Sequence, residues 1–292
     1  MKVYILFIVI IGYLFMAQQC KSPEKKIQYP QAKKVDTVDN YFGTKVSDPY
    51  RWLEDDNSEE TAKWVEAENK ITNSYLQKIP FRDGLENRLT EIWNYPKYGV
   101  PFNKENNYFF FKNDGVQNQS VLYIQDGING EPKVLLDPNK LSEDGTVALS
   151  SMGISKDGRY LGYGISRGGS DWSEIYVMEI DTRKNLKDHI EWVKFSGISW
   201  KDDGFFYSSY GEPEEGDELS GQNRFHKVYY HKLGDPQSND KLIYGDDNNP
   251  LRNFYAYLTE DEKYLILTAT ESTSGNALYA AKLNGLENIK FH

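Results

Sequence analysis

The chain has 292 residues, 39% hydrophobic and 14% aromatic, so it is long enough to bury one large core or two ordinary ones. Its 34 lysines and arginines against 44 aspartates and glutamates give a net charge of −10, which repels a nucleic-acid backbone. One cysteine excludes a disulfide within the chain, and four histidines at no metal-ligand spacing predict no metal site. We expect no cofactor.

The N-terminus has the pattern of an export signal. The apolar run from Val3 to Ala17 is too short to span a bilayer comfortably and has the length of a signal-peptide core. We therefore predict a signal peptide over 1–19 and a polar linker over 20–27, with a membrane anchor as the alternative.

Cys20 stands where a bacterial lipoprotein is cleaved and lipidated, although Gln18 and Gln19 replace the small residues that usually precede that cysteine. We therefore expect an exported protein, either periplasmic or attached to a membrane through a lipid on Cys20.

Two amphipathic helices are predicted within residues 28–94. The first covers about Ser58 to Leu76, with Asn57 and Glu60 as a capping pair. The second is indicated by Leu85, Leu89, Ile92 and Trp93, which share one helical face.

From residue 95 onward, one unit of strands recurs four times. Each copy closes on a hydrophobic-tyrosine pair, at Tyr123, Tyr176, Tyr229 and Tyr279, and the tyrosines are 53, 53 and 50 residues apart. Ahead of each lies a polar turn that runs into an aromatic strand, near Tyr108, Tyr160, Phe205 and Tyr264. A fixed period of this size is typical of β-propeller blades, whereas sandwich turns recur every ~8–12 residues.

The predicted fold is therefore mainly β, with a partial propeller over 95–292. Propellers close with roughly 4–8 blades, so four units suggest an interrupted array. Because the blades of a propeller together close the propeller's own core, we expect the two helices to pack on another domain.

Gly164-Ile165-Ser166-Arg167-Gly168 matches the G-x-S-x-G nucleophile elbow of α/β-hydrolases. The elbow needs a strand that turns into a helix, whereas a loop and another strand are predicted here. We therefore expect Ser166 to lie in a hairpin connection and not to be catalytic. A carboxylate pair of the glycosidase kind stays open, but the acids around Glu212 and Asp217 have the pattern of a solvated loop.

Several long strings in this chain resemble the N-terminal part of the prolyl oligopeptidases. They include residues 48–72, Tyr95–Tyr98, Gln117–Gln119, Gly169–Trp172, Val193–Ser196 and Lys227–Leu233, and the similarity runs in order from about residue 29 to 285. The resemblance implies a serine peptidase that cuts short peptides after proline, with a seven-bladed propeller inserted into an α/β-hydrolase domain.

It also implies a division of labour. Residues 28–94 would be the first segment of the hydrolase domain, and 95–292 would be about four of seven blades. The catalytic triad would follow in a C-terminal hydrolase domain, so no catalytic residue is expected in this chain. The partial propeller would then exclude folded proteins and admit short proline-containing peptides.

Two positions are carried over as substrate-binding residues. Phe195 matches a propeller phenylalanine that lines the pocket beside the bound proline, with a place in the blade core as the alternative. Asn253, Thr270 and Thr273 stand where well-known mammalian members have a methionine, an arginine and a cysteine. This more polar pocket leaves open a related oligopeptidase of different specificity, and a stand-alone propeller used as a binding or scaffold module is a further alternative.

Overall fold

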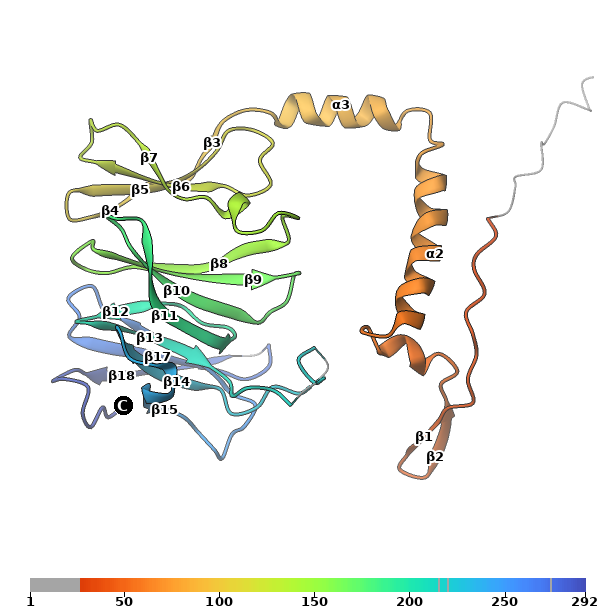
Figure 1. Cartoon of the computed structure of the whole chain (residues 1–292). Coiled ribbons are helices and arrows are strands. Elements are labelled where there is room, and N and C mark those ends of the chain that lie inside the picture. The colour runs from red at the N-terminus through yellow and green to blue at the C-terminus, as the bar shows by residue number, and fades with distance from the viewer. Residues whose placement is uncertain (1–26, 215, 220, 274) are drawn as a thin grey trace, which may run out of the picture. The chain divides into compact units, whose positions relative to one another are not determined.

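The structure is a computed structural model that describes residues 27–292, apart from 215, 220 and 274. The expected signal peptide, Cys20 and most of the linker lie outside the described residues. The chain divides into two compact units, one ending at Leu89 and one comprising Thr90–His292 (Figure 1).

The first unit contains a short hairpin and helices. Its elements are β1 (Val38–Tyr41), β2 (Thr44–Ser47), the 3-10 helix η1 (Arg51–Glu54), α2 (Glu59–Leu76) and the first part of α3 (Arg82–Trp93). Both predicted helices are confirmed. The predicted cap is wrong by one residue, because Ser58 adopts the extended conformation before the helix and its Oγ accepts a hydrogen bond from the N–H of Thr61 at 3.1 Å.

The apolar side chains of the two helices are largely open to solvent in the described structure. None of the α3 residues is buried, and Leu89 is 58% and Trp93 62% exposed. On α2, Val65, Tyr75 and Leu76 are also exposed.

The second unit is built from antiparallel strands in four successive groups (Figure 1). The first group is β3 (Lys97–Tyr98), β4 (Phe102–Lys104), β5 (Asn107–Asn113), β6 (Val121–Asp126) and β7 (Lys133–Leu136). The second is β8 (Val147–Ile154), β9 (Tyr160–Arg167), β10 (Ser173–Glu179) and β11 (Lys184–Val193). The third is β12 (Ser199–Lys201), β13 (Gly204–Ser209), β14 (Lys227–Lys232) and β15 (Lys241–Tyr244). The fourth is β16 (Asn253–Leu258), β17 (Tyr264–Thr270) and β18 (Asn276–Lys282).

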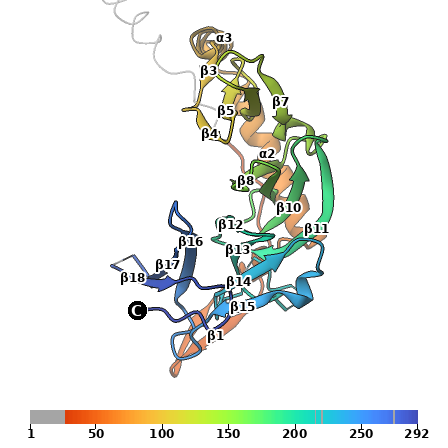
Figure 2. The ribbon, with the colours of Figure 1, turned by 90° about the vertical axis from the view of Figure 1, so that its left-hand side faces the viewer.

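These groups confirm the repeat predicted from the tyrosines. In each group the aromatic strand pairs antiparallel with the strand that carries the tyrosine: β5 with β6, β9 with β10, β13 with β14 and β17 with β18. A single residue pair, Val193 with Ser209, joins the second and third groups into one sheet. Within this unit, the groups follow one another in an arc (Figure 2).

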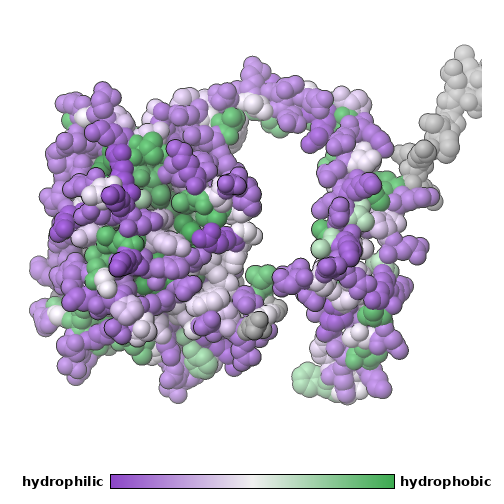
Figure 3. Space-filling view, in the orientation of Figure 1, coloured by the Kyte–Doolittle hydropathy of each residue, from purple (hydrophilic) through white to green (hydrophobic). Residues whose placement is uncertain are grey.

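The cores lie between neighbouring groups. Phe109 and Leu122 of the first group pack with Leu161 and Met178 of the second. Ile175 and Ile190 of the second pack with Trp200 and Phe205 of the third. Two further clusters join the third group to the fourth, around Val228 with Phe254 and around Phe206 with Leu265. On the face shown in Figure 3, apolar side chains of this unit gather in patches among polar ones.

The turns between the first two strands of the second and fourth groups share one hydrogen-bond pattern. Ser155 donates to Asp157 Oδ1 at 2.6 Å, and its Oγ accepts from the N–H of Tyr160 at 2.9 Å. Thr259, Asp261 and Tyr264 repeat these contacts at 2.8 and 3.1 Å. The left-handed position of the turn is Gly158 in one copy and Glu262 in the other, with φ of 69° and 55°.

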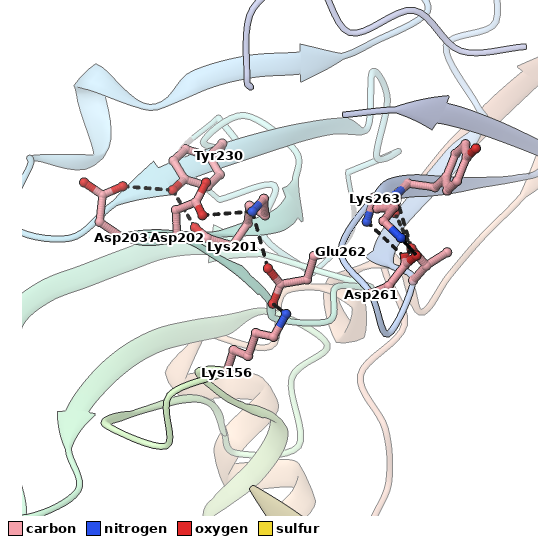
Figure 4. A network of polar contacts seen from close by, with 10 residues as sticks. Lys156, Lys201, Asp202, Asp203, Tyr230, Asp261, Glu262 and Lys263 are labelled. Carbon is pink, nitrogen blue, oxygen red and sulfur yellow. Dashed lines mark hydrogen bonds and ion pairs between the residues drawn. The ribbon is translucent and has the colours of Figure 1, made fainter. Parts of the chain in front are cut away.

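Glu262 connects three groups at this end of the strands, which we call the turn end (Figure 4). Its Oε1 lies 3.4 Å from Lys156 Nζ of the second group, and its Oε2 lies 3.3 Å from Lys201 Nζ of the third. Lys201 Nζ also donates to Asp202 Oδ1 at 2.8 Å. A charged side chain therefore occupies a backbone conformation that favours glycine, where it bridges neighbouring turns.

Replacing Leu265 with alanine should destabilise the second unit by about 2–5 kcal/mol, because the side chain is fully buried between the third and fourth groups. Leu242→Ala on β15 is the matched control, since Leu242 is 53% exposed and should cost less than ~1 kcal/mol. Urea unfolding followed by circular dichroism measures both. Equal losses in the two variants would contradict the packing described here.

Candidate functional site

The two expected substrate-binding residues lie at the same end of the strands, opposite the turn end. Phe195 follows β11, whose last residue Val193 pairs with Ser173 at the start of β10. Asn253 begins β16 and pairs with Thr270 at the end of β17. We call this the loop end, because the connections Arg167–Ser173 and Tyr210–His226 also lie there.

Phe195 is not part of a blade core. It is 42% exposed and has a left-handed backbone, with φ of 53°. Beside it, Lys194 is buried, and its Nζ lies 5.5 Å from the centre of the Phe195 ring and 5.0 Å from that of Trp172. Asp171 Oδ2, 3.6 Å from this Nζ, is the acidic partner of Lys194. The residue before Phe195 is thus fixed by aromatic and ionic contacts.

His226 links the segments that carry Phe195 and Asn253. Its Nε2 lies 2.9 Å from the carbonyl oxygen of Lys194, and its Nδ1 accepts from the N–H of Phe254 at 2.9 Å. These partners define a neutral ring with the proton on Nε2. The side chain is fully buried, and burial lowers the pKa of His226 to about 4, although the hydrogen bond to Lys194 opposes this shift.

Asn253 is held by a second contact to the same cluster. The Tyr210 hydroxyl donates to Asn253 Oδ1, and the Tyr210 ring lies 4.4 Å from that of His226. Burial raises the pKa of Tyr210 to about 12, so its hydroxyl stays a donor at neutral pH. Phe195 and Asn253 therefore depend on one buried, neutral group of residues, comprising Tyr210, His226 and Phe254.

A cavity of about 890 Å³ opens at the loop end beside this cluster. Its lining combines the aromatic side chains of Trp172, Tyr210 and Phe225 with acidic residues of the Tyr210–His226 connection. Trp172 anchors that connection, because its Nε1 donates to the carbonyl oxygen of Glu218 at 2.7 Å. Glu212, Glu214 and Asp217 are exposed, as predicted for a solvated loop.

The predicted hairpin connection is present, but Ser166 itself is the penultimate residue of β9, where it pairs with Ser173 of β10. Gly168 and Gly169, with φ of 59° and 77°, turn the chain into β10. A strand follows where a nucleophile elbow needs a helix, so this connection does not form one.

The sequence did not reveal a buried group around His231. The ring lies 3.0 Å from Asp188 Oδ1 through Nε2 and 2.7 Å from Asp240 Oδ1 through Nδ1, and all three side chains are at most 2% exposed. Burial by itself lowers the pKa of His231, but hydrogen bonds to Asp240 and Asp188 raise it above its usual value. Asp188 also accepts from the N–H of Gly234 at 2.6 Å. The group fastens β11 and β14 to the residue that follows the 3-10 helix η3 (Gln237–Asn239).

Within residues 27–292, leaving out the three undescribed positions, no cluster of three or more His, Cys, Asp or Glu side chains could hold a metal ion. None of the helices in that part of the chain is both long and apolar enough to cross a membrane.

A family model described as "Prolyl oligopeptidase, N-terminal beta-propeller domain" matches residues 30–290. The prolyl endopeptidase of Elizabethkingia meningoseptica is 50% identical over 284 residues, which cover 97% of this chain and 40% of that protein. The prolyl endopeptidase of Elizabethkingia miricola is 47% identical over the same shares. The chain thus spans about two fifths of the length of these relatives.

Solved structures agree with this similarity. Prolyl oligopeptidase B from Galerina marginata, bound to a 25mer macrocyclization substrate, aligns with a TM-score of 0.78 and 31% identity. The alignment covers 90% of this chain and 41% of that one. The predicted propeller fold and the resemblance stated from the sequence are both confirmed, whereas the roles of Phe195 and Asn253 stay predictions.

The stability of the second unit should fall as the pH drops from about 6.5 to 4. The pKa of His226 is lowered in the folded state, so the unfolded chain binds the proton first as the pH drops. The contribution of His226 to the free energy of unfolding is therefore complete above pH 6.5 and is lost as the pH falls toward 4. The loss amounts to about 3 kcal/mol. Urea unfolding at several pH values measures it, with His226→Gln as the comparison. The free energy of unfolding is compared with that of each protein at pH 6.5. An equal decrease in His226→Gln and in the wild type between pH 6.5 and 4 would show that His226 is not the cause.

Proposed function

We propose, because the chain belongs to the prolyl oligopeptidase family, that it is the N-terminal part of a serine peptidase that hydrolyses short peptides after proline. The observation that carries the proposal is the family match over residues 30–290, together with 50% identity to a prolyl endopeptidase. The part proposed for this chain is to contact the peptide and restrict access to the active site. The nucleophile, base and oxyanion hole are supplied by an α/β-hydrolase domain.

The geometry of the loop end supports a peptide-contacting role. Phe195 presents an exposed aromatic face there, and Asn253 lies at the same end through the His226 cluster. An aromatic ring supplies apolar area for a substrate residue, and the polar groups beside it fix orientation.

The two helices support the proposed hydrolase partner. The exposed apolar residues of α2 and α3 are the kind of surface that another domain covers. A stand-alone propeller would leave these faces in water, so the two-domain peptidase is the better explanation.

The product of the complete reading frame should cleave a blocked glycyl-prolyl fluorogenic peptide. Phe195→Ala should lower kcat/KM roughly 10- to 100-fold, mainly through KM, since burying a phenylalanine contributes about 1.5–3 kcal/mol. Tyr257→Ala is the control and should keep the wild-type kcat/KM. Tyr257 is similarly exposed, at 49%, but it lies near the other end of β16 from Asn253. Cleavage by the 292-residue chain alone would refute the proposed hydrolase partner, and unchanged kinetics in the Phe195 variant would remove that residue from the site.

We further propose that the protein is exported and lipidated on Cys20, on the basis of the apolar run that precedes this residue. In a bacterial host, the wild-type protein should enter the membrane fraction and Cys20→Ser should not. Mass spectrometry of the mature N-terminus is the direct measurement. A wild-type N-terminus without a lipid would leave plain secretion as the explanation.

A further inference from the structure

A second, smaller hollow of about 280 Å³ lies beside Phe195, and the site described above does not use it. Asp171, Val193 and Phe195 form part of its wall. The rest is hydroxyl-bearing: Ser150, Ser151, Ser166, Ser170, Ser173 and Ser196. We call this cavity the serine hollow.

A β-bulge aims two of these serines at one point. The register between β8 and β9 shifts between Leu149 and Ser151, so Ser150 is the extra residue opposite Gly164. A Cβ on Gly164 would lie 2.5 Å from Ser151 Oγ and 2.7 Å from Ser150 Oγ. Both hydroxyls therefore lie over Gly164, in the space that a side chain at this position would fill. Bulges commonly re-aim side chains in this way next to functional sites.

The next strand pair adds two more hydroxyls. Ser166 on β9 and Ser173 on β10 are direct cross-strand partners, so their side chains lie on the same face of the sheet. Gly164 and Ser166, which matched the nucleophile motif but do not form an elbow, therefore both belong to the strand face that lines the hollow.

Four hydroxyls of the hollow are free to bind a ligand. Ser170 accepts from the N–H of Trp172, and Ser196 accepts from the N–H of Ser208, so these two are occupied. Across the described chain, the side chains of Ser150, Ser151, Ser166 and Ser173 have no hydrogen-bond partner. Since each hydroxyl both donates and accepts, the set suits a group that also does both.

The charges at the rim favour a neutral ligand. Asp171 is the acidic residue of the lining, and its carboxylate lies 3.6 Å from the ammonium of Lys194. The two charges offset each other there, which leaves neither a cation nor an anion a strong counter-charge.

We propose that the serine hollow is a subsite for a neutral polar side chain, of the carboxamide or hydroxyl class, in a peptide that also contacts Phe195. The inference rests on the proposed peptidase function and adds a preference to it. The residue upstream of the proline lies against Phe195, and the next residue upstream occupies the hollow, where Ser150, Ser151, Ser166 and Ser173 exchange hydrogen bonds with it.

The test compares two blocked fluorogenic peptides, Gln-Gly-Pro and Leu-Gly-Pro, as substrates of the complete reading-frame product. The wild type should favour the glutamine peptide in kcat/KM by roughly 3- to 10-fold, the range expected for one net hydrogen bond. The double variant Ser166→Ala, Ser173→Ala keeps the space and removes two hydroxyls, so the ratio should fall to about 1. Ser272→Ala, in the corresponding loop of the fourth group, should keep the wild-type ratio.

Two outcomes overturn the inference: a wild-type ratio near 1, or a ratio that survives in the double variant. If the wild-type product cleaves neither peptide, it is the proposed function that has failed. Calorimetry then measures the Kd of both peptides for the 292-residue chain and for the same variants. The inference is tested by the ratio of the two Kd values in place of the ratio of kcat/KM.

Discussion

The fold depends on one constraint, which is that a small β-sheet cannot bury both of its faces by itself. In this chain every core cluster of the second unit joins consecutive groups of strands, from Phe109 with Leu161 to Phe206 with Leu265. Stability in such an array is mostly a sum of interfaces between neighbours. The 50- to 53-residue period is therefore the spacing at which each group of strands supplies an apolar face that packs on the next group.

The same constraint places the candidate site. Since neighbouring groups pack side by side, residues that are far apart in sequence meet at the loop end. His226 contacts the carbonyl of Lys194 and the N–H of Phe254, residues 32 and 28 positions away. The aromatic ring, the amide and the hydroxyls that the proposed peptide site would use therefore come from the ends of adjacent strands and the connections beside them.

Much of the fold could be predicted from the sequence, because tyrosine spacing and aromatic strands are local patterns with a fixed period. Phe195 and Asn253 were found through resemblance to a family, and no local pattern marks them. His226 and the Asp188–His231–Asp240 group escaped notice because their partners come from other strand groups, which one sequence does not bring together. The bulge at Ser150 was also missed, because it is a property of the pairing between β8 and β9, which the sequence of one strand does not show. The error at the cap of α2 was local: Asn57 and Ser58 are both good capping residues, and backbone geometry chose the second.

One contact at each end of the strands joins neighbouring groups, and the two contacts differ in charge and in burial. At the loop end, His226 is fully buried and uncharged, so dissolved ions do not weaken its hydrogen bonds. At the turn end, Glu262 joins Lys156 and Lys201 through ion pairs, and Lys156 is 63% exposed. Exposed ion pairs weaken as the Debye length shortens. Salt therefore weakens the exposed Lys156–Glu262 pair at the turn end, while the buried hydrogen bonds of His226 at the loop end do not depend on it.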